Sequence, residues 1–82
     1  MRINDINSVS LRMGLDMQFA GRNARVVVAL PKDGKKFYIG LRGTAENRSE
    51  AFVYDYDQHG VGEQAQQVMI QMGVKPEVIE VL

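Results

Sequence analysis

The residues best suited to chemistry lie in one short segment, where the single histidine, His59, follows the acidic residues Asp55 and Asp57. An imidazole beside carboxylates can act as a base or join a metal site. A metal site needs three or four converging ligands, and only these neighbours are visible. The two aspartates are two positions apart and share one face of a strand, so they do not face each other across a cleft. We therefore expect no catalytic residues, no metal ion and no cofactor.

Two further patterns with catalytic potential are also weak. Gly60-Val61-Gly62 precedes a predicted helix, but the segment lacks the lysine and hydroxyl of a phosphate-binding loop. Glu63 adds a negative charge where an anion would bind. None of the serines lies in a nucleophile elbow. We interpret the glycines as the turn into the helix and expect a protein that is not an enzyme.

Length and composition indicate one small globular domain spanning residues 1–82. The 82 residues are 45% hydrophobic and 24% charged, which is ordinary for a globular chain. The lack of cysteine excludes disulfides and thiolate chemistry. No run approaches the roughly 18 apolar residues of a membrane span, and no signal peptide begins the chain. The expected location is the cytoplasm.

The formal net charge is zero, yet the charges are unevenly distributed. Residues 1–48 hold nine of the ten basic side chains and four of the ten acidic ones, whereas residues 49–82 hold one basic and six acidic side chains. Such asymmetry is seen in proteins with nucleic-acid or acidic partners. It is also seen where two halves fold against each other and partly cancel, which is the interpretation we favour.

The clearest pattern of secondary structure in the chain lies at 9–19, where apolar and polar residues alternate strictly. The apolar positions are Val9, Leu11, Met13, Leu15, Met17 and Phe19. Strict alternation predicts a β-strand with one apolar face. We expect this strand at a sheet edge, with Met13 and Met17 sharing a core with Met69 and Met72.

The remaining elements complete an α+β fold. We predict a four-stranded antiparallel, strongly curved meander with strands at about 9–19, 24–30, 36–42 and 51–57. The apolar period changes to that of a helix at about 61–72, which ends at Gly73 and packs on one face of the sheet. Residues 76–82 form either a short helix or a strand. Strand 24–30 is rich in valine and is expected to be covered on both faces.

A strand at 9–19 would be as long as the whole domain, because eleven residues extend roughly 33–36 Å and the expected radius of gyration is about 12 Å. It must curl, or pair at the sheet edge with another chain. The second outcome predicts a homodimer formed by edge-strand pairing.

These features favour a small binding module that acts through a protein partner. On the predicted helix, Ile70 lies opposite the core face, beside glutamines. The candidate partner interface comprises Ile70, Gln66, Gln67, Tyr54 and Tyr56. We expect a regulator or inhibitor, of the kind that phages and mobile elements carry.

The alternative is a nucleic-acid-binding protein that uses the basic turns and the outer face of the sheet. Its candidate contacts are Arg12, Arg22, Arg25, Lys35, Lys36, Tyr38 and Arg42. Arg12, Tyr38 and Arg42 would share one outer face and offer cations and an aromatic ring for stacking. The pI of about 6.6 is far from the basic values typical of such modules.

Overall fold

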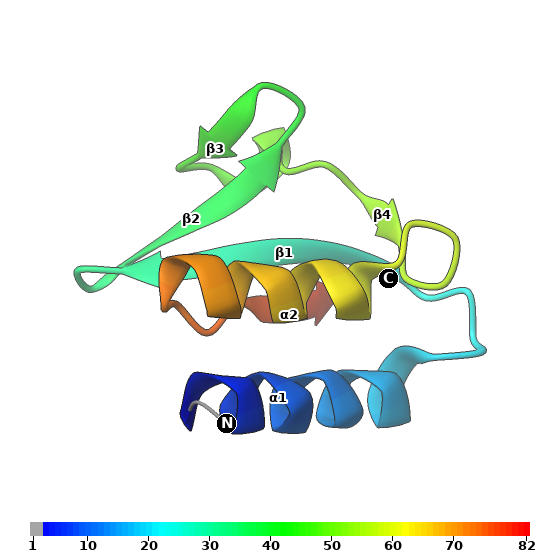
Figure 1. Cartoon of the computed structure of the whole chain (residues 1–82). Coiled ribbons are helices and arrows are strands. Elements are labelled where there is room, and N and C mark those ends of the chain that lie inside the picture. The colour runs from blue at the N-terminus through cyan, green and yellow to red at the C-terminus, as the bar shows by residue number, and fades with distance from the viewer. Residues whose placement is uncertain (1–2) are drawn as a thin grey trace.

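The computed structural model describes residues 3–82 and shows an α+β fold with an antiparallel sheet, as predicted (Figure 1). The elements in chain order are α1 (Ile3–Phe19), β1 (Arg25–Lys32), β2 (Lys35–Gly40), β3 (Gly43–Ala45), a 3-10 turn (Arg48–Glu50), β4 (Tyr54–Asp55), α2 (Val61–Met72) and β5 (Glu77–Glu80). The two helices run antiparallel (Figure 1), and Val61 and Ala65 of α2 pack in one cluster with Val26 and Val28 of β1. The Cα radius of gyration is 12.3 Å, close to the expected value.

The prediction of a strand at 9–19 was wrong, because these residues belong to helix α1. Every second apolar residue of this alternating segment also follows the four-residue spacing of a helix. Leu11, Leu15 and Phe19 are four residues apart, which places them on one side of a helix at about 100° per residue. Leu15 and Phe19 are buried there, and Leu11 packs against them. The predicted edge-strand homodimer is therefore also wrong for this segment, since no strand is present in it.

The residue types of this segment favour a helix, although their alternating pattern is typical of a strand. After Val9, the segment to Phe19 contains no β-branched residue. It contains two leucines, two methionines, one arginine and one glutamine, residue types that lose little side-chain freedom in a helix. Propensity thus favoured the helix and packing of the Leu11, Leu15 and Phe19 side settled it.

Strand β1 is the centre of the sheet and confirms the prediction for 24–30. Its residues Val26–Leu30 are all buried. One edge pairs with β5, while the other is shared by β2 and β4. Because β2 and β3 rise away from β1 and Ala51 bridges back to Gly40, the sheet curls into a half-barrel (Figure 1).

The later predicted strands are present but differ in length. β2 matches 36–42 except at its end, whereas only residues 54 and 55 of the predicted strand 51–57 form β4. The segment 43–50, which lies between the predicted strands 36–42 and 51–57, contains β3 and the 3-10 turn. Between the two predicted outcomes for 76–82, the structure shows the strand, β5. Helix α2 has the predicted bounds, and Gly73 ends it with φ +67°.

The hairpin between β1 and β2 closes on Asp33-Gly34, where both residues have positive φ (+52° and +78°). This pair of conformations matches the right-handed twist of the strands, and aspartate followed by glycine is among its preferred sequences. This turn therefore follows from local sequence. The segment 20–23 joins α1 to β1, with Gly21 and Asn23 in the positive-φ conformations that their types permit.

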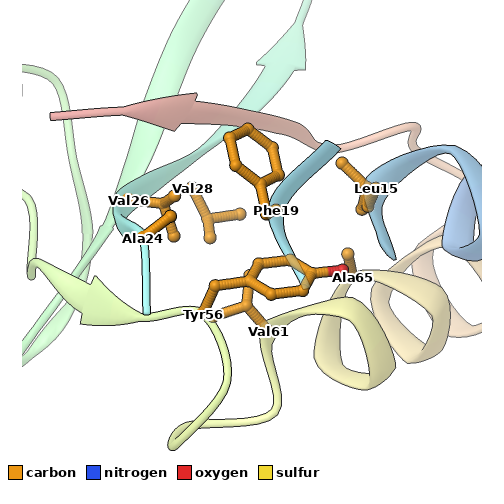
Figure 2. Packing of buried hydrophobic residues seen from close by; sticks show 8 residues of the cluster. All are labelled: Leu15, Phe19, Ala24, Val26, Val28, Tyr56, Val61 and Ala65. Atoms are coloured by element: carbon orange, nitrogen blue, oxygen red, sulfur yellow. The ribbon is translucent and has the colours of Figure 1, made fainter. Parts of the chain in front are cut away.

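The hydrophobic core lies between the two helices and one face of the sheet. Its buried members are Leu15, Phe19, Ala24, Val26, Val28, Tyr56, Val61 and Ala65 (Figure 2). The rings of Phe19 and Tyr56 lie near its middle, with centroids 5.4 Å apart. The predicted methionine core is wrong: Met13, Met17 and Met72 are exposed. On a helix, the first two of these lie on the side of α1 that faces away from the core.

Candidate protein-binding face on helix α1

An exposed apolar stripe runs along the outer side of α1. Val9, Met13 and Met17 are 48%, 60% and 88% exposed and are spaced four residues apart. This spacing keeps three side chains within about 80° of the helix circumference. The stripe is therefore a continuous apolar ridge on the surface of the protein.

The ridge is a direct consequence of the alternating sequence. Val9 and Leu11 are two positions apart and so lie about 200° apart around a helix. The alternating apolar residues consequently divide into an inner set, which fills the core, and an outer set, which the rest of the described chain leaves uncovered. A helix with apolar residues on both sides is typical of an element with packing partners on both sides.

The outer side of α1 also lacks charge. Between Asn7 and Phe19 its exposed residues are Asn7, Val9, Ser10, Met13, Gly14, Met17 and Gln18. The charged residues in this range, Arg12 and Asp16, contact α2 but border this face, because their side chains are 41% and 42% exposed. Since 24% of the chain is charged, a helix face without charge is a distinct feature. Loss of charge and enrichment in methionine are typical of the centres of protein interfaces. We call Val9, Ser10, Met13, Gly14 and Met17 the α1 outer face.

Gly14 adds a second observation about this face. Glycine inside a helix is less stable than alanine by about 0.5–1 kcal/mol. A Cβ at Gly14 would meet no atom within 4 Å, and no positive φ requires glycine there. No neighbouring atom in the described chain therefore requires glycine at this position.

The inner side of α1 is held by a polar network that fixes which side faces outward. The Tyr56 hydroxyl donates a hydrogen bond to Asp16 Oδ1 at 2.5 Å, and Arg12 Nη1 donates one to Gln66 Oε1 at 3.3 Å. Arg12 Nε lies 3.4 Å from Asp16 Oδ2, an ionic contact without hydrogen-bond geometry. Burial of Tyr56, together with its bond to Asp16, raises the pKa of the phenol well above its usual range.

Gly62 allows the two helices to approach at this network. A Cβ there would lie 2.5 Å from Tyr56 Oη and 2.8 Å from Asp16 Oδ1, which is closer than real contacts allow. The glycine predicted to form the turn into α2 thus also has a packing role. Together these contacts determine the rotation of α1 about its axis, and with it the exposure of the ridge.

The residues predicted for a partner interface do not form one surface. Tyr56 is only 3% exposed and belongs to the core, so its place in that interface was wrong. Tyr54 is half-buried in an aromatic cluster with Phe52, at a centroid distance of 4.7 Å. Gln67 is exposed on α2.

Gln66 and Ile70 lie on the side of α2 that borders α1. Gln66 is half-buried and bonds Arg12. Ile70 lies one turn after Gln66 and so on the same side of α2. Ile70 is half-buried there. The prediction had assigned Val9, Met13 and Met17 themselves to the core.

The residues predicted for nucleic-acid contact are dispersed by the fold. Arg25, Lys36 and Tyr38 share one sheet face, since Tyr38 stands opposite Ala29 and alternate residues point the same way. Arg12 lies instead on α1 against α2, so its predicted place beside Tyr38 was wrong. The others occupy three turns or strand ends: Arg22 before β1, Lys35 at the start of β2, and Arg42 between β2 and β3.

Two ion pairs tie the basic half of the chain to its acidic half. Arg22 Nη2 lies 3.1 Å from Glu80 Oε2, and Lys36 Nζ lies 2.9 Å from Glu77 Oε2. Both pairs hold β5 against the sheet, and the hydrogen bond to Glu77 raises the pKa of Lys36. The expectation that the two halves partly cancel is confirmed. Because Arg22 and Lys36 are paired with glutamates, fewer unpaired basic side chains remain to bind the phosphates of a nucleic acid.

In the segment 55–59, His59, Asp55 and Asp57 form hydrogen bonds and ring contacts within the fold. His59 Nδ1 accepts a hydrogen bond from the Asp55 N–H at 2.8 Å, and its ring packs edge-on to Tyr54. Asp57 accepts bonds from the N–H groups of Gly21 and Asn23, both at 2.8 Å, and these lower the pKa of its carboxyl. Among the described residues, no three His, Cys, Asp or Glu side chains are grouped to hold a metal ion.

A second apolar feature is a groove of about 300 Å³ between the β1–β2 hairpin and the end of α2. Its apolar walls come from Leu30, Phe37, Met72 and Val74. This volume is at the lower end for a small-molecule site, and a few well-placed polar groups are what such sites use for orientation. Only Thr44 and Lys32 supply polar groups here.

Comparison with known protein families, curated proteins and solved structures finds no match. Function is therefore inferred from the residues and their geometry alone. Within residues 3–82, neither helix is long and apolar enough to cross a membrane.

Proposed function

We propose that this protein is a small non-enzymatic binding module whose contact surface is the α1 outer face. The observation that supports this most is the exposed, uncharged ridge of Val9, Met13 and Met17 on a helix whose opposite side already fills the core. Methionine side chains adapt to varied apolar surfaces, which suits a contact role. Gly14 permits a partner backbone to come close.

A regulator or inhibitor fits this chemistry, because binding alone would be its activity. Such small proteins occur in phages and mobile elements among other sources. The cysteine-free sequence is compatible with a reducing compartment, and we propose the cytoplasm.

Site-specific photo-cross-linking in the cells that make the protein tests this proposal. A photo-reactive side chain at position 13 or 17 should form a discrete protein adduct. Leu41 provides the matched control, since it is an 83% exposed apolar residue in a turn away from α1. Absence of any protein adduct at positions 13 and 17, or equal adducts at position 41, would contradict the proposal.

The alternative function, nucleic-acid binding, has narrower support. Arg25 and Tyr38 share a sheet face with Lys36, but Lys36 is paired with Glu77. Within the described part of the chain, Arg25 and Arg42 are in no ion pair. These two arginines are the residues that a test of this alternative should change.

A further inference from the structure

We propose that the groove between the β1–β2 hairpin and the end of α2 binds a small amphiphilic carboxylate. Its hydrocarbon part would lie in the groove, and its carboxylate between Lys32 and Lys35. Among residues 3–82, none from α1 lines this groove. The inference therefore goes beyond the proposed function and does not depend on it. Three observations support it: where the groove lies, what lines it and which charges border it.

The groove is the uncovered end of the sheet face that carries the core. Val28 of this face belongs to the core cluster, and Leu30 follows two positions later, so both point the same way from the strand. Phe37 stands opposite Leu30 in the β1–β2 register. Helix α2 ends at Gly73, beside the hairpin (Figure 1). The apolar face thus extends past the end of the helix that covers its other part.

The lining of the groove selects a hydrocarbon ligand. Apolar walls surround about 300 Å³ and come from Leu30, Phe37, Met72 and Val74. Thr44 adds one hydroxyl, whereas a sugar or a nucleotide needs several hydrogen-bonding groups. Met72 is 57% exposed, and its flexible thioether can adapt to the shape of a ligand. The small volume limits the ligand to a short chain or a single ring.

Two lysines at the hairpin end of the groove supply the charge. Lys32 and Lys35 stand directly opposite each other in the β1–β2 register, and both are exposed. They lie on the groove side of the hairpin, because they are two positions from Leu30 and Phe37. Like charges directly opposite each other destabilise a pair of strands. A carboxylate between the two lysines would offset this repulsion and pair with both.

Neither lysine is neutralised within the described part of the chain. The ion pairs of residues 3–82 include neither of them, whereas Lys36, on the opposite face of the sheet, pairs with Glu77. Asp33 in the turn, and Glu46, which borders an adjoining hollow with Lys35, lie outside ion-pairing distance of both. An anionic head group therefore meets two available cations here, and a cationic one is repelled.

Titration of the full chain with octanoate, followed by backbone amide NMR, is the primary test. Saturable shift changes should cluster on residues 30–37, 44 and 72–74, with a dissociation constant on the order of 1 mM for so small a ligand. Octylammonium has the same hydrocarbon chain and the opposite charge, and it should bind at least roughly 5-fold more weakly. The inference is overturned by equal binding of the two amphiphiles. It is also overturned if roughly 10 mM octanoate causes no saturable change in these residues.

Two variants separate the role of the charges from that of the apolar wall. Lys32→Gln/Lys35→Gln should weaken octanoate binding by roughly 5-fold and leave the binding of octan-1-ol unchanged, because the alcohol carries no charge. Met72→Glu places a carboxylate in the wall and should weaken octanoate binding by roughly 10-fold or more.

Arg48→Gln is the matched control, since Arg48 is an exposed basic residue in the 3-10 turn and does not line the groove. It should leave the binding of octanoate and octan-1-ol unchanged. Unchanged octanoate binding in the double lysine variant would contradict the proposed site, as would an equal loss in Arg48→Gln. The amide spectrum of each variant shows whether it retains the fold.

Discussion

Tyr56 donates a hydrogen bond of 2.5 Å to Asp16, joining the segment after β4 to helix α1 across forty positions of sequence. The tyrosine is buried, whereas the carboxylate is half-exposed beside Arg12. The bond therefore sits at the boundary between core and surface, where it fixes the rotation of α1.

Loss of this bond should loosen α1 without removing the aromatic packing. We expect Tyr56→Phe to lower the free energy of unfolding by about 1.5 kcal/mol, the value of a hydrogen bond to a charged group. Chemical denaturation measures this change. Tyr54→Phe is a matched control at a half-buried tyrosine, and an equal loss there would contradict the special role of the Tyr56–Asp16 bond.

The two helical glycines should respond in opposite directions to the same substitution. Gly62→Ala places a Cβ against Tyr56 Oη and should destabilise the fold by about 1–3 kcal/mol. Gly14→Ala meets open space and should stabilise the monomer by roughly 0.5–1 kcal/mol. Thermal and denaturant unfolding at a concentration where the chain is monomeric measures both. Destabilisation of the monomer by Gly14→Ala would show that the glycine has a role inside the chain.

Asp57 should make the fold sensitive to acid. Its hydrogen bonds from the N–H groups of Gly21 and Asn23 lower its pKa in the folded state. The resulting stabilisation is present above the unfolded-state pKa of about 4 and is lost as pH falls through the folded-state value. We expect Asp57→Asn to be less stable at neutral pH and to lose less stability on acidification. A pH series of denaturation midpoints tests this, and parallel curves for the two proteins would contradict it.

Nucleic-acid binding should be absent under conditions that favour it. We expect no change in the fluorescence anisotropy of a short labelled single strand or duplex at about 50 mM salt. Binding that falls with salt, by a slope of roughly −0.7 to −0.9 per phosphate contacted, would contradict this expectation. Its loss in Arg25→Ala/Arg42→Ala would then assign it to those arginines.

The parts of the fold set by local chemistry were predictable. Asp33-Gly34 closes the β1–β2 hairpin because both residues accept positive φ. Val61–Met72 forms a helix because its apolar residues have a helical period and Gly73 ends it. The buried run Val26–Leu30 indicated a central strand. In each case neighbouring residues alone specify the conformation.

The candidate site was less predictable because it depends on α1. The interface prediction included Ile70 and Gln66, which border α1, but it assigned Met13 and Met17 to the core. That error followed from treating strict alternation as a strand. A helix through the same residues places Met13 and Leu15 about 200° apart, so only one of them can face the core.

By itself, the sequence determined an α+β chain with a central valine-rich strand, a C-terminal helix and no cysteine chemistry. Only the tertiary structure decided that residues 9–19 are helical and which of their apolar residues are buried. The physical reason is that alternation satisfies two backbone periods: as a strand it has one apolar face, and as a helix it has two. Packing of Leu15 and Phe19 against β1 and α2 selected the helix, and this choice left Val9, Met13 and Met17 exposed.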